Sequence, residues 1–200
     1  MNVMGIIGTA GRKNDKIHMT KQLWENMIVH AITTVEDRNP EELVSGGAAW
    51  ADHLAVVLFR ENLVPSLTLY LPAEFQNSKF VHPQGQYRNP GSIANYYHQN
   101  MSRQLGYSTL RELQSAIDAG AKVHVIQGFK TRNTYVARAS DYLLAFTFGT
   151  HSGTYRPGQP GYTHHQPAGL KDGGTADTWN KAQSRIKEHK SLWELQNSTS

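Results

Sequence analysis

Three short glycine-rich segments of the sequence could bind an anion. They are residues 8–11 (GTAG), residues 45–48 (SGGA) and residues 173–175 (GGT). Glycine lets the backbone approach a phosphate without a Cβ atom in the way, and a following helix offers unpaired N–H groups and the positive end of its dipole. A single such turn also serves as a plain tight bend. The anion-binding hypothesis therefore depends on the three turns meeting at one edge of the fold.

Two arginines near these turns are the polar side chains that we expect in such a site. Arg12 directly follows the first turn, and Arg132 precedes Asn133 in a polar segment. A guanidinium group grips phosphate through two hydrogen bonds and stays charged, although either arginine could instead form a structural salt bridge. Asp52, in the helix expected after the second turn, would hold a ribose hydroxyl or brace the glycine turn, and we favour the second role. Asp141 is expected to anchor neighbouring backbone.

Aromatic rings near these segments could stack on a base. His98 lies beside Tyr96 and Tyr97, and we expect it to point at the site. Trp50 follows the second turn, and Phe129 precedes Arg132. For each of these rings, packing in the core is the alternative interpretation.

The sequence predicts no metal site and no cofactor. His151, His164 and His165 fall in one polar loop, but no helical pair of histidines and no supporting carboxylate spacing accompanies them. The chain has no cysteine, which excludes disulfides, thiolate metal sites and cysteine nucleophiles. It also lacks the G-x-S-x-G elbow, the P-loop lysine pattern and the G-x-G-x-x-G of redox dinucleotide folds, so we do not expect hydride transfer.

Length and charge narrow the function further. Two hundred residues suit a single domain spanning residues 1–200. The net charge of +4 is mild and scattered, which suits a small anionic ligand and argues against nucleic acid as a partner. No run of eighteen apolar residues predicts a membrane span, and the cysteine-free chain fits the cytoplasm.

Hydrophobic periodicity predicts alternating strands and helices. The expected strands are residues 3–7, 43–44, 66–72, 122–126 and 141–148, and the expected helices are residues 20–39, 48–62, 91–105, 108–119, 133–139 and 175–190. Residues 73–90 and 149–170 are predicted to be loops that could cover a site, and residues 197–200 a frayed tail. Such alternation predicts a Rossmann-like α/β sandwich of three layers, with a mostly parallel sheet and helices on both faces. Ligands of these sheets bind beyond the carboxyl ends of the strands, where the glycine turns fall.

Four segments in order resemble the SLOG superfamily, which joins the Rossmann domain of DNA-processing protein A, the LOG phosphoribohydrolases and YspA-like proteins. Residues 45–55 (SGGAAWADHLA) resemble its S-G-x-A-x-G-x-D-x-x-A signature. Residues 8–12 resemble its opening glycine turn, residues 132–141 its R-N segment that ends in A-D, and residues 173–175 its final G-G-T turn. The likeness spans about residues 3–190. It implies a nucleotide-binding pocket, because relatives bind or cleave nucleoside monophosphates or sense ADP-ribose-type signals.

The last of these segments departs from the enzymes of that superfamily. In the LOG enzymes the corresponding segment resembles the pattern P-G-G-x-G-T-x-x-E. Its glutamate is the residue expected to support cleavage of the glycosidic bond. In this sequence Thr178 takes that position, and the nearest carboxylate, Asp177, is one residue early and one methylene shorter. One residue turns a helix by about 100°, so Asp177 should point elsewhere. The departure favours binding over catalysis.

The sequence therefore predicts a protein that holds a nucleotide or a nucleotide-derived molecule, such as an NAD- or ADP-ribose-derived signal, without cleaving it. The alternative is an N-glycosidase of nucleoside 5′-monophosphates with Asp177 as its carboxylate, and single-stranded nucleic-acid binding ranks third. We also expect a homo-oligomer. The predicted ligand-binding residues are Gly8, Thr9, Ala10, Gly11, Arg12, Ser45, Gly46, Gly47, Asp52, His98, Arg132, Asn133, Gly173, Gly174 and Thr175.

Overall fold

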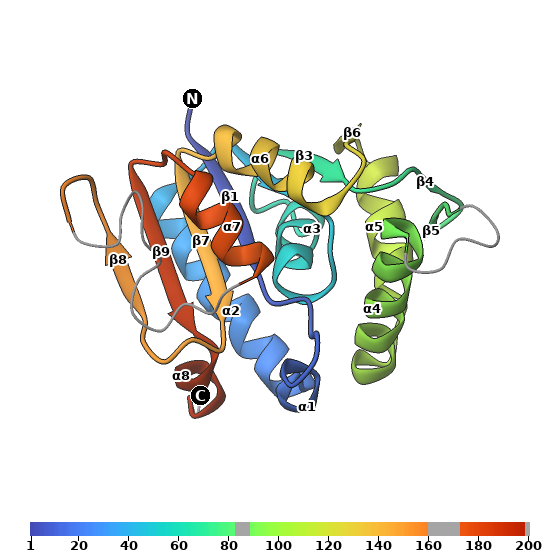
Figure 1. Ribbon diagram of the computed structural model, residues 1–200, viewed down its shortest axis with the longest axis horizontal. Coiled ribbons are helices and arrows are strands. Elements are labelled where there is room, and N and C mark those ends of the chain that lie inside the picture. Colours follow the sequence, from blue (N-terminus) through green and yellow to red (C-terminus); the bar gives the residue numbers. More distant parts are fainter. Residues whose placement is uncertain (83–88, 160–172, 199–200) are drawn as a thin grey trace.

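The structure, a computed structural model, describes residues 1–82, 89–159 and 173–198. Its centre is a seven-stranded sheet in the order β6-β3-β2-β1-β7-β9-β8, parallel except for β8 against β9, and β4 and β5 form a separate antiparallel hairpin (Figure 1). The strands are β1 (Val3–Gly8), β2 (Glu42–Ser45), β3 (Ser66–Leu71), β4 (Phe75–Gln76), β5 (Lys79–Phe80), β6 (Lys122–Val125), β7 (Tyr142–Thr147), β8 (Gly153–Tyr155) and β9 (Ile186–Ser191). The helices are α1 (Asp15–His18), α2 (Lys21–Arg38), the 3-10 turn η1 (Trp50–Asp52), α3 (His53–Arg60), α4 (Pro90–Leu105), α5 (Thr109–Asp118), α6 (Phe129–Ala139), α7 (Gly174–Lys181) and α8 (Leu192–Gln196).

Helices cover both faces of this sheet. In Figure 1, α6 and α7 lie in front of the sheet and α2 lies behind it. Side chains of β1 alternate between the two cores, as a strand buried on both faces requires. Ile6 packs into the larger core with Leu54 of α3, and Ile7 packs into the smaller core with Val136 of α6. The predicted Rossmann-like three-layer α/β sandwich is confirmed.

The chain order places a crevice at the middle of the sheet. From β1 the chain moves outward through β2 and β3 to β6, and it then returns to β7 on the other side of β1. The connections after β1 and β7 therefore leave the sheet in different directions. Open α/β sheets bind ligands in the crevice that forms at such a switch point.

Helix α4 forms a wall beside this crevice, and its ends follow from the sequence. The Asn89 side chain caps its start by accepting a hydrogen bond from the Ser92 amide at 2.9 Å, and Pro90 occupies the first turn. Gly106 ends the helix in the left-handed conformation, with φ of 84°.

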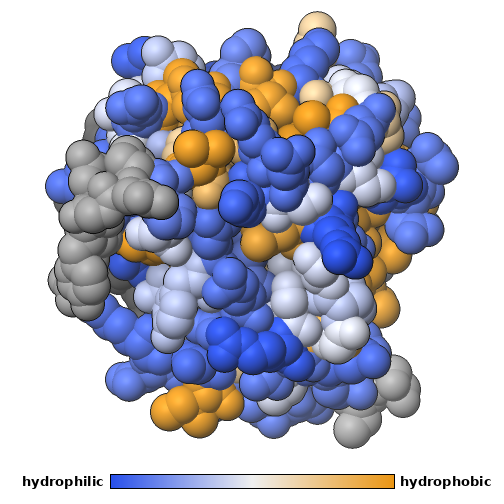
Figure 2. Space-filling view, turned by 90° about the vertical axis from the view of Figure 1, so that its right-hand side faces the viewer, coloured by the Kyte–Doolittle hydropathy of each residue, from blue (hydrophilic) through white to orange (hydrophobic). Residues whose placement is uncertain are grey.

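The side of the molecule that carries α4 and α5 is mostly hydrophilic, with hydrophobic residues in several separate areas (Figure 2).

The predicted helix over residues 175–190 is wrong. Helix α7 ends at Lys181, strand β9 follows, and α8 comes after it. The strand escaped prediction because its buried face is polar: Lys187, His189 and Ser191 point inward and bind protein groups. Lys187, for instance, donates to the Trp179 carbonyl oxygen at 2.6 Å. A strand whose inward side chains are polar lacks the hydrophobic alternation by which strands are recognised.

Smaller differences affect three other segments. Helix α6 begins at Phe129, four residues before the predicted start of a helix at residue 133. The loop predicted over residues 73–90 contains the β4–β5 hairpin, and the loop predicted over residues 149–170 contains β8. Residues 83–88, 160–170 and 199–200 of the predicted loops and tail lie outside the described residues, as do His164 and His165.

Candidate functional site

A cavity of about 450 Å³ lies at the switch point, and all three glycine turns line it. Its volume falls in the range of small-molecule sites. Twelve of the predicted ligand-binding residues contribute to its wall: Gly8, Thr9, Ala10, Arg12, Gly46, Gly47, Asp52, Arg132, Asn133, Gly173, Gly174 and Thr175. Four other predicted residues, Gly11, Ser45, His98 and Asp177, are not among the residues that line it.

The first turn is built by close packing at the end of β1. A Cβ atom on Gly8 would lie 2.1 Å from the Phe146 carbonyl oxygen of β7, and the φ of 153° also disfavours a side chain. The Thr9 hydroxyl donates to Asp15 at 2.6 Å and accepts from the Gly11 amide at 3.1 Å. Gly11 therefore shapes the turn from outside the cavity, and Thr9 joins the turn to α1.

The second turn is held together by Ser45 and Asp52. The Ser45 hydroxyl accepts from the Gly47 amide at 3.1 Å and donates to the Asp52 carbonyl oxygen at 2.9 Å. The Asp52 carboxylate accepts from the Ala48 amide at 3.2 Å. Helix α3 begins only at His53, so Asp52 lies in the 3-10 turn η1 and not inside a helix that starts at residue 48, as the sequence suggested. Its position just before the helix lets its carboxylate fold back onto the turn.

A buried ion pair lies at the second turn. Arg132 Nη1 is 3.2 Å from Asp52 Oδ2, and both side chains are more than nine-tenths buried. Gly46 makes room for it, because a Cβ atom there would lie 1.3 Å from Arg132 Nη1. Burial raises the pKa of Asp52, an effect that the charge of Arg132 opposes, and burial lowers the pKa of Arg132. Arg132 Nε has no hydrogen-bond partner among the described residues, so this guanidinium keeps an unused donor.

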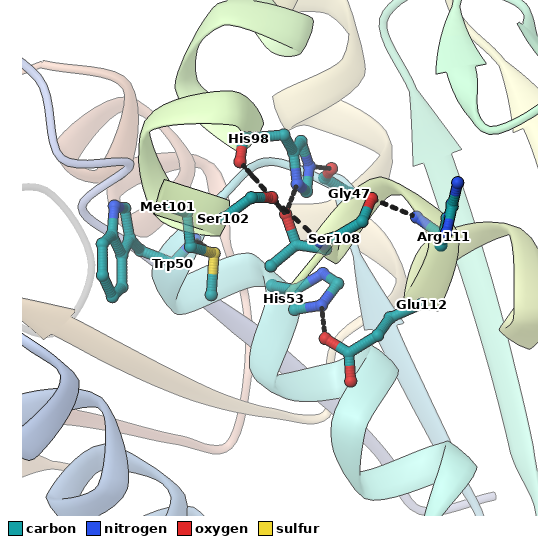
Figure 3. A network of polar contacts seen from close by, with 10 residues as sticks. Gly47, Trp50, His53, His98, Met101, Ser102, Ser108, Arg111 and Glu112 are labelled. Carbon is teal, nitrogen blue, oxygen red and sulfur yellow. Dashed lines mark hydrogen bonds and ion pairs between the residues drawn. The ribbon is translucent and has the colours of Figure 1, made fainter. Parts of the chain in front are cut away.

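His98 supports the second turn instead of facing a ligand, which corrects the prediction that it points at the site. It is fully buried, and its Nε2 lies 2.9 Å from the Gly47 carbonyl oxygen (Figure 3). A carbonyl oxygen only accepts, so Nε2 carries the hydrogen and Nδ1 accepts from the Thr109 hydroxyl at 2.9 Å. Burial, and then nearby His53, lower the pKa of His98 to about 3, so the ring is neutral near pH 7.

A second contact from α4 secures the residues that follow. The Trp50 amide donates to the Met101 sulfur at 3.1 Å, and Figure 3 shows Met101 on the same helix as His98. Trp50 has a φ of 63°, an unusual conformation for an aromatic residue, and its ring is buried. It therefore packs in the core, the alternative interpretation of this ring, and does not line the cavity.

The third turn begins α7. Asn133 donates to the Gly174 carbonyl oxygen at 3.3 Å and so joins α6 to this turn. Thr178, at the position of the enzymes' glutamate, lines the cavity. Asp177 forms an ion pair with Lys181 at 2.9 Å and accepts from Asn133 at 3.4 Å, outside the cavity wall. The threonine and not the carboxylate therefore faces the cavity.

Cations and rings form the remaining walls. The Arg12 guanidinium carbon is 5.4 Å from the centre of the Tyr97 ring, and that of Arg132 is 5.6 Å from the centre of the Phe129 ring. Both rings line the cavity, as does Lys13, which the sequence reasoning missed although it directly follows Arg12. Further wall residues that were missed are Asn14, Asp15, Pro72, Ile93, Ala94, Val136 and Thr147. Thr147 ends β7, and its place at a strand end was the signal that could have found it.

Neither a group of metal-binding side chains nor a membrane-spanning helix is found among the described residues. Within residues 1–82, 89–159 and 173–198, no three His, Asp or Glu side chains are grouped as a metal ion would require. No helix in those same ranges is long and apolar enough to cross a membrane.

Comparison with known proteins places the chain in a family. A scan against protein-family models found no match. The chain is similar to the uncharacterized protein R261 of Acanthamoeba polyphaga mimivirus, with 37% identity over 191 residues that cover 92% of each chain. This likeness extends over nearly the whole length of both proteins, and because the relative is uncharacterized it carries no activity with it. The protein thus belongs to one family with the uncharacterized mimivirus protein R261.

Proposed function

We propose that the protein binds a nucleotide or a nucleotide-derived small molecule in the cavity at the switch point, and that it holds this ligand without cleaving it. The observation that carries the proposal is the meeting of all three glycine turns around one cavity that also contains Arg12, Lys13 and Arg132. Cations and closely approaching backbone suit phosphate, and the rings of Tyr97 and Phe129 suit a base. The likeness of four segments to the SLOG superfamily supports membership of it and agrees with this function.

The cavity's carboxylates favour binding over cleavage. Among the wall residues, the carboxylates belong to Asp15 and Asp52. Asp15 accepts from the Thr9 hydroxyl, and Asp52 is bound by Arg132 and backbone amides. Cleavage of a glycosidic bond needs a carboxylate that can reach the reacting atoms, and Asp177 of the N-glycosidase alternative lies outside the wall. Release of free base from mononucleotides would contradict the proposal.

Titration calorimetry of the full chain tests ligand binding directly. The panel comprises the 5′-monophosphates of adenosine, guanosine, cytidine and uridine, together with NAD, ADP-ribose and cyclic ADP-ribose isomers. Arg12→Gln removes a cation that lines the cavity, and we expect the affinity for the bound nucleotide to fall by about tenfold or more. Arg60→Gln is the matched control, because Arg60 is exposed on α3 and is not part of the cavity wall. No binding across the whole panel would end the proposal.

We further propose that the protein acts in the cytoplasm as a homo-oligomer. The cysteine-free sequence supports the compartment. Light scattering coupled to size-exclusion chromatography measures the mass of the protein in solution. A monomeric mass would contradict the proposed homo-oligomer.

A further inference from the structure

The second glycine turn already contains an anion, the side chain of Asp52. Its carboxylate accepts hydrogen bonds from the Ala48 amide and from Arg132 Nη1, each at 3.2 Å, and the Gly46 backbone also hydrogen-bonds to it. The Gly47 amide donates to Ser45 instead. The donors of this turn, which would otherwise attract a phosphate, are therefore used inside the protein.

The charge of Arg132 is compensated in the same way. Its guanidinium lies against Asp52 in the space that a Cβ atom on Gly46 would need, and both members of the pair are buried. A phosphate placed there would meet the negative charge of Asp52 at low local dielectric, where repulsion between like charges is strong. What this end of the cavity still offers is the Asp52 carboxylate as an acceptor, because the unpartnered Nε of Arg132 is itself buried.

The cations beside the first turn differ from Arg132 in their exposure and in their lack of an ion pair among the described residues. Arg12 and Lys13 are exposed, and both line the cavity. None of the ion pairs found among the described residues includes either of them. Arg12 instead lies over the face of the Tyr97 ring, 5.4 Å from its centre.

Resting on the nucleotide-binding function proposed above, we propose that Asp52 determines what each end of the cavity binds. Because Asp52 cancels the charge of Arg132, that end takes an uncharged, hydroxyl-bearing part of the nucleotide, the ribose. A hydroxyl group can donate a hydrogen bond to the Asp52 carboxylate, which a phosphate without a hydrogen cannot do. The phosphate is bound at the first turn by Arg12 and Lys13. Asp52 thereby also keeps free inorganic phosphate away from Arg132. The protein gains specificity because a phosphate at this end would be repelled by the Asp52 carboxylate.

Calorimetry with adenosine 5′-monophosphate, adenosine and inorganic phosphate tests the role of Asp52 in the full chain. Asp52→Asn keeps the size of the side chain and removes its charge, which leaves the charge of Arg132 uncompensated. We expect the variant to bind inorganic phosphate about tenfold more tightly than the natural chain, and adenosine about tenfold less tightly. Unchanged or weaker phosphate binding in a folded Asp52→Asn variant would overturn the proposal.

A neutral pair of substitutions keeps the test valid if the single variant does not fold. The double variant Asp52→Asn with Arg132→Gln buries no unpaired charge, and it should not gain phosphate affinity.

The ratio of the dissociation constants of adenosine and adenosine 5′-monophosphate measures what the phosphate group contributes to binding. We expect this ratio to be kept in the double variant and to fall by about tenfold in Arg12→Gln. The opposite pattern, with the ratio lost only when Arg132 is neutralised, would assign the phosphate to Arg132 and refute the proposal.

The two proposals fail in different ways. If the natural chain binds neither adenosine nor its monophosphate, the nucleotide-binding function fails for adenine ligands. The comparison of inorganic phosphate binding between the natural chain and Asp52→Asn still tests whether Asp52 blocks an anion site at Arg132.

Discussion

At the scale of single residues, the site depends on one close approach. The guanidinium of Arg132 reaches Asp52 only because Gly46 has no side chain. A glycine in a strand-to-helix turn is usually explained by its backbone conformation, but no positive φ is found at Gly46, whereas Gly47 has a φ of 71°. Its role is to leave space, and that role can be tested separately from backbone strain.

Gly46→Ala should destabilise the protein. The added Cβ atom would lie 1.3 Å from Arg132 Nη1, so the buried ion pair must move. We expect the free energy of unfolding to fall by about 1–3 kcal/mol, the usual cost of overpacking, as measured by urea denaturation. Gly174→Ala is the matched control, because its nearest foreign atom, Asn133 Nδ2, is at 3.7 Å, an ordinary contact. Equal stability of the two variants would refute this account of Gly46.

Asp177→Asn should leave ligand binding almost unchanged. Asp177 lies outside the cavity wall, and its ion pair with Lys181 is about one-third exposed on both sides. Exposed pairs of this kind contribute about 0.3–0.5 kcal/mol, so the variant should also unfold at nearly the same urea concentration. Calorimetry with the nucleotide that the natural chain binds is the measurement. A tenfold loss of affinity would show that Asp177 reaches the ligand and would revive its catalytic assignment.

At the scale of elements, α4 does two things at once. Ala94 and Tyr97 line the cavity, while His98 and Met101, each four residues further along, hold the second turn and the Trp50 amide that follows it. A helix presents residues three and four apart on one side, so one rigid element couples the wall of the cavity to the turn. Helix α4 and the presence of His98 on it follow from the sequence, but the ring does not face the ligand as predicted. Its role could not be predicted, because buried hydrogen-bond partners that are distant in sequence leave no local pattern.

The buried state of His98 predicts a dependence of stability on pH. The pKa of His98 is about 3 in the folded protein and near 6.5 in the unfolded chain. The contribution of the neutral, buried ring to the stability of the folded protein is therefore fully present above pH 6.5. Below that pH the unfolded chain takes up a proton that the folded chain does not. The free energy of unfolding should therefore fall by up to about 1.4 kcal/mol per pH unit from this residue alone.

His98→Gln isolates this contribution, because glutamine keeps an N–H donor but does not titrate. Urea unfolding of both proteins at pH 7, 6 and 5 should show a shallower decline for the variant. The stability difference between the two chains should consequently narrow as the pH falls. A constant difference over this range would mean that the imidazole is not shielded from protons in the folded state.

At the scale of the whole molecule, the fold was easier to predict than the site. Apolar strands such as β1 and β7 carry a strong local signal, and their alternation with helices was sufficient for the three-layer architecture. Strand β9 was missed because Lys187 and His189 fill its buried face, a pattern that makes sense only once Trp179 and Thr147 are in place. The glycine turns were found from their composition. The pairing of Asp52 with Arg132 was not, because 80 residues separate them.

The central position of β1 has a consequence for how the chain is made. β1 pairs with β2 on one side and with β7 on the other, and β7 is not synthesised until residues 142–147. Until then the growing sheet ends in the strand VMGIIG, which has no charge and no proline to discourage pairing with another chain. A nascent or shortened product that stops before β7 thus carries an open, apolar strand edge, the kind of surface that aggregates or engages chaperones. Only the arrival of the second half of the chain closes it.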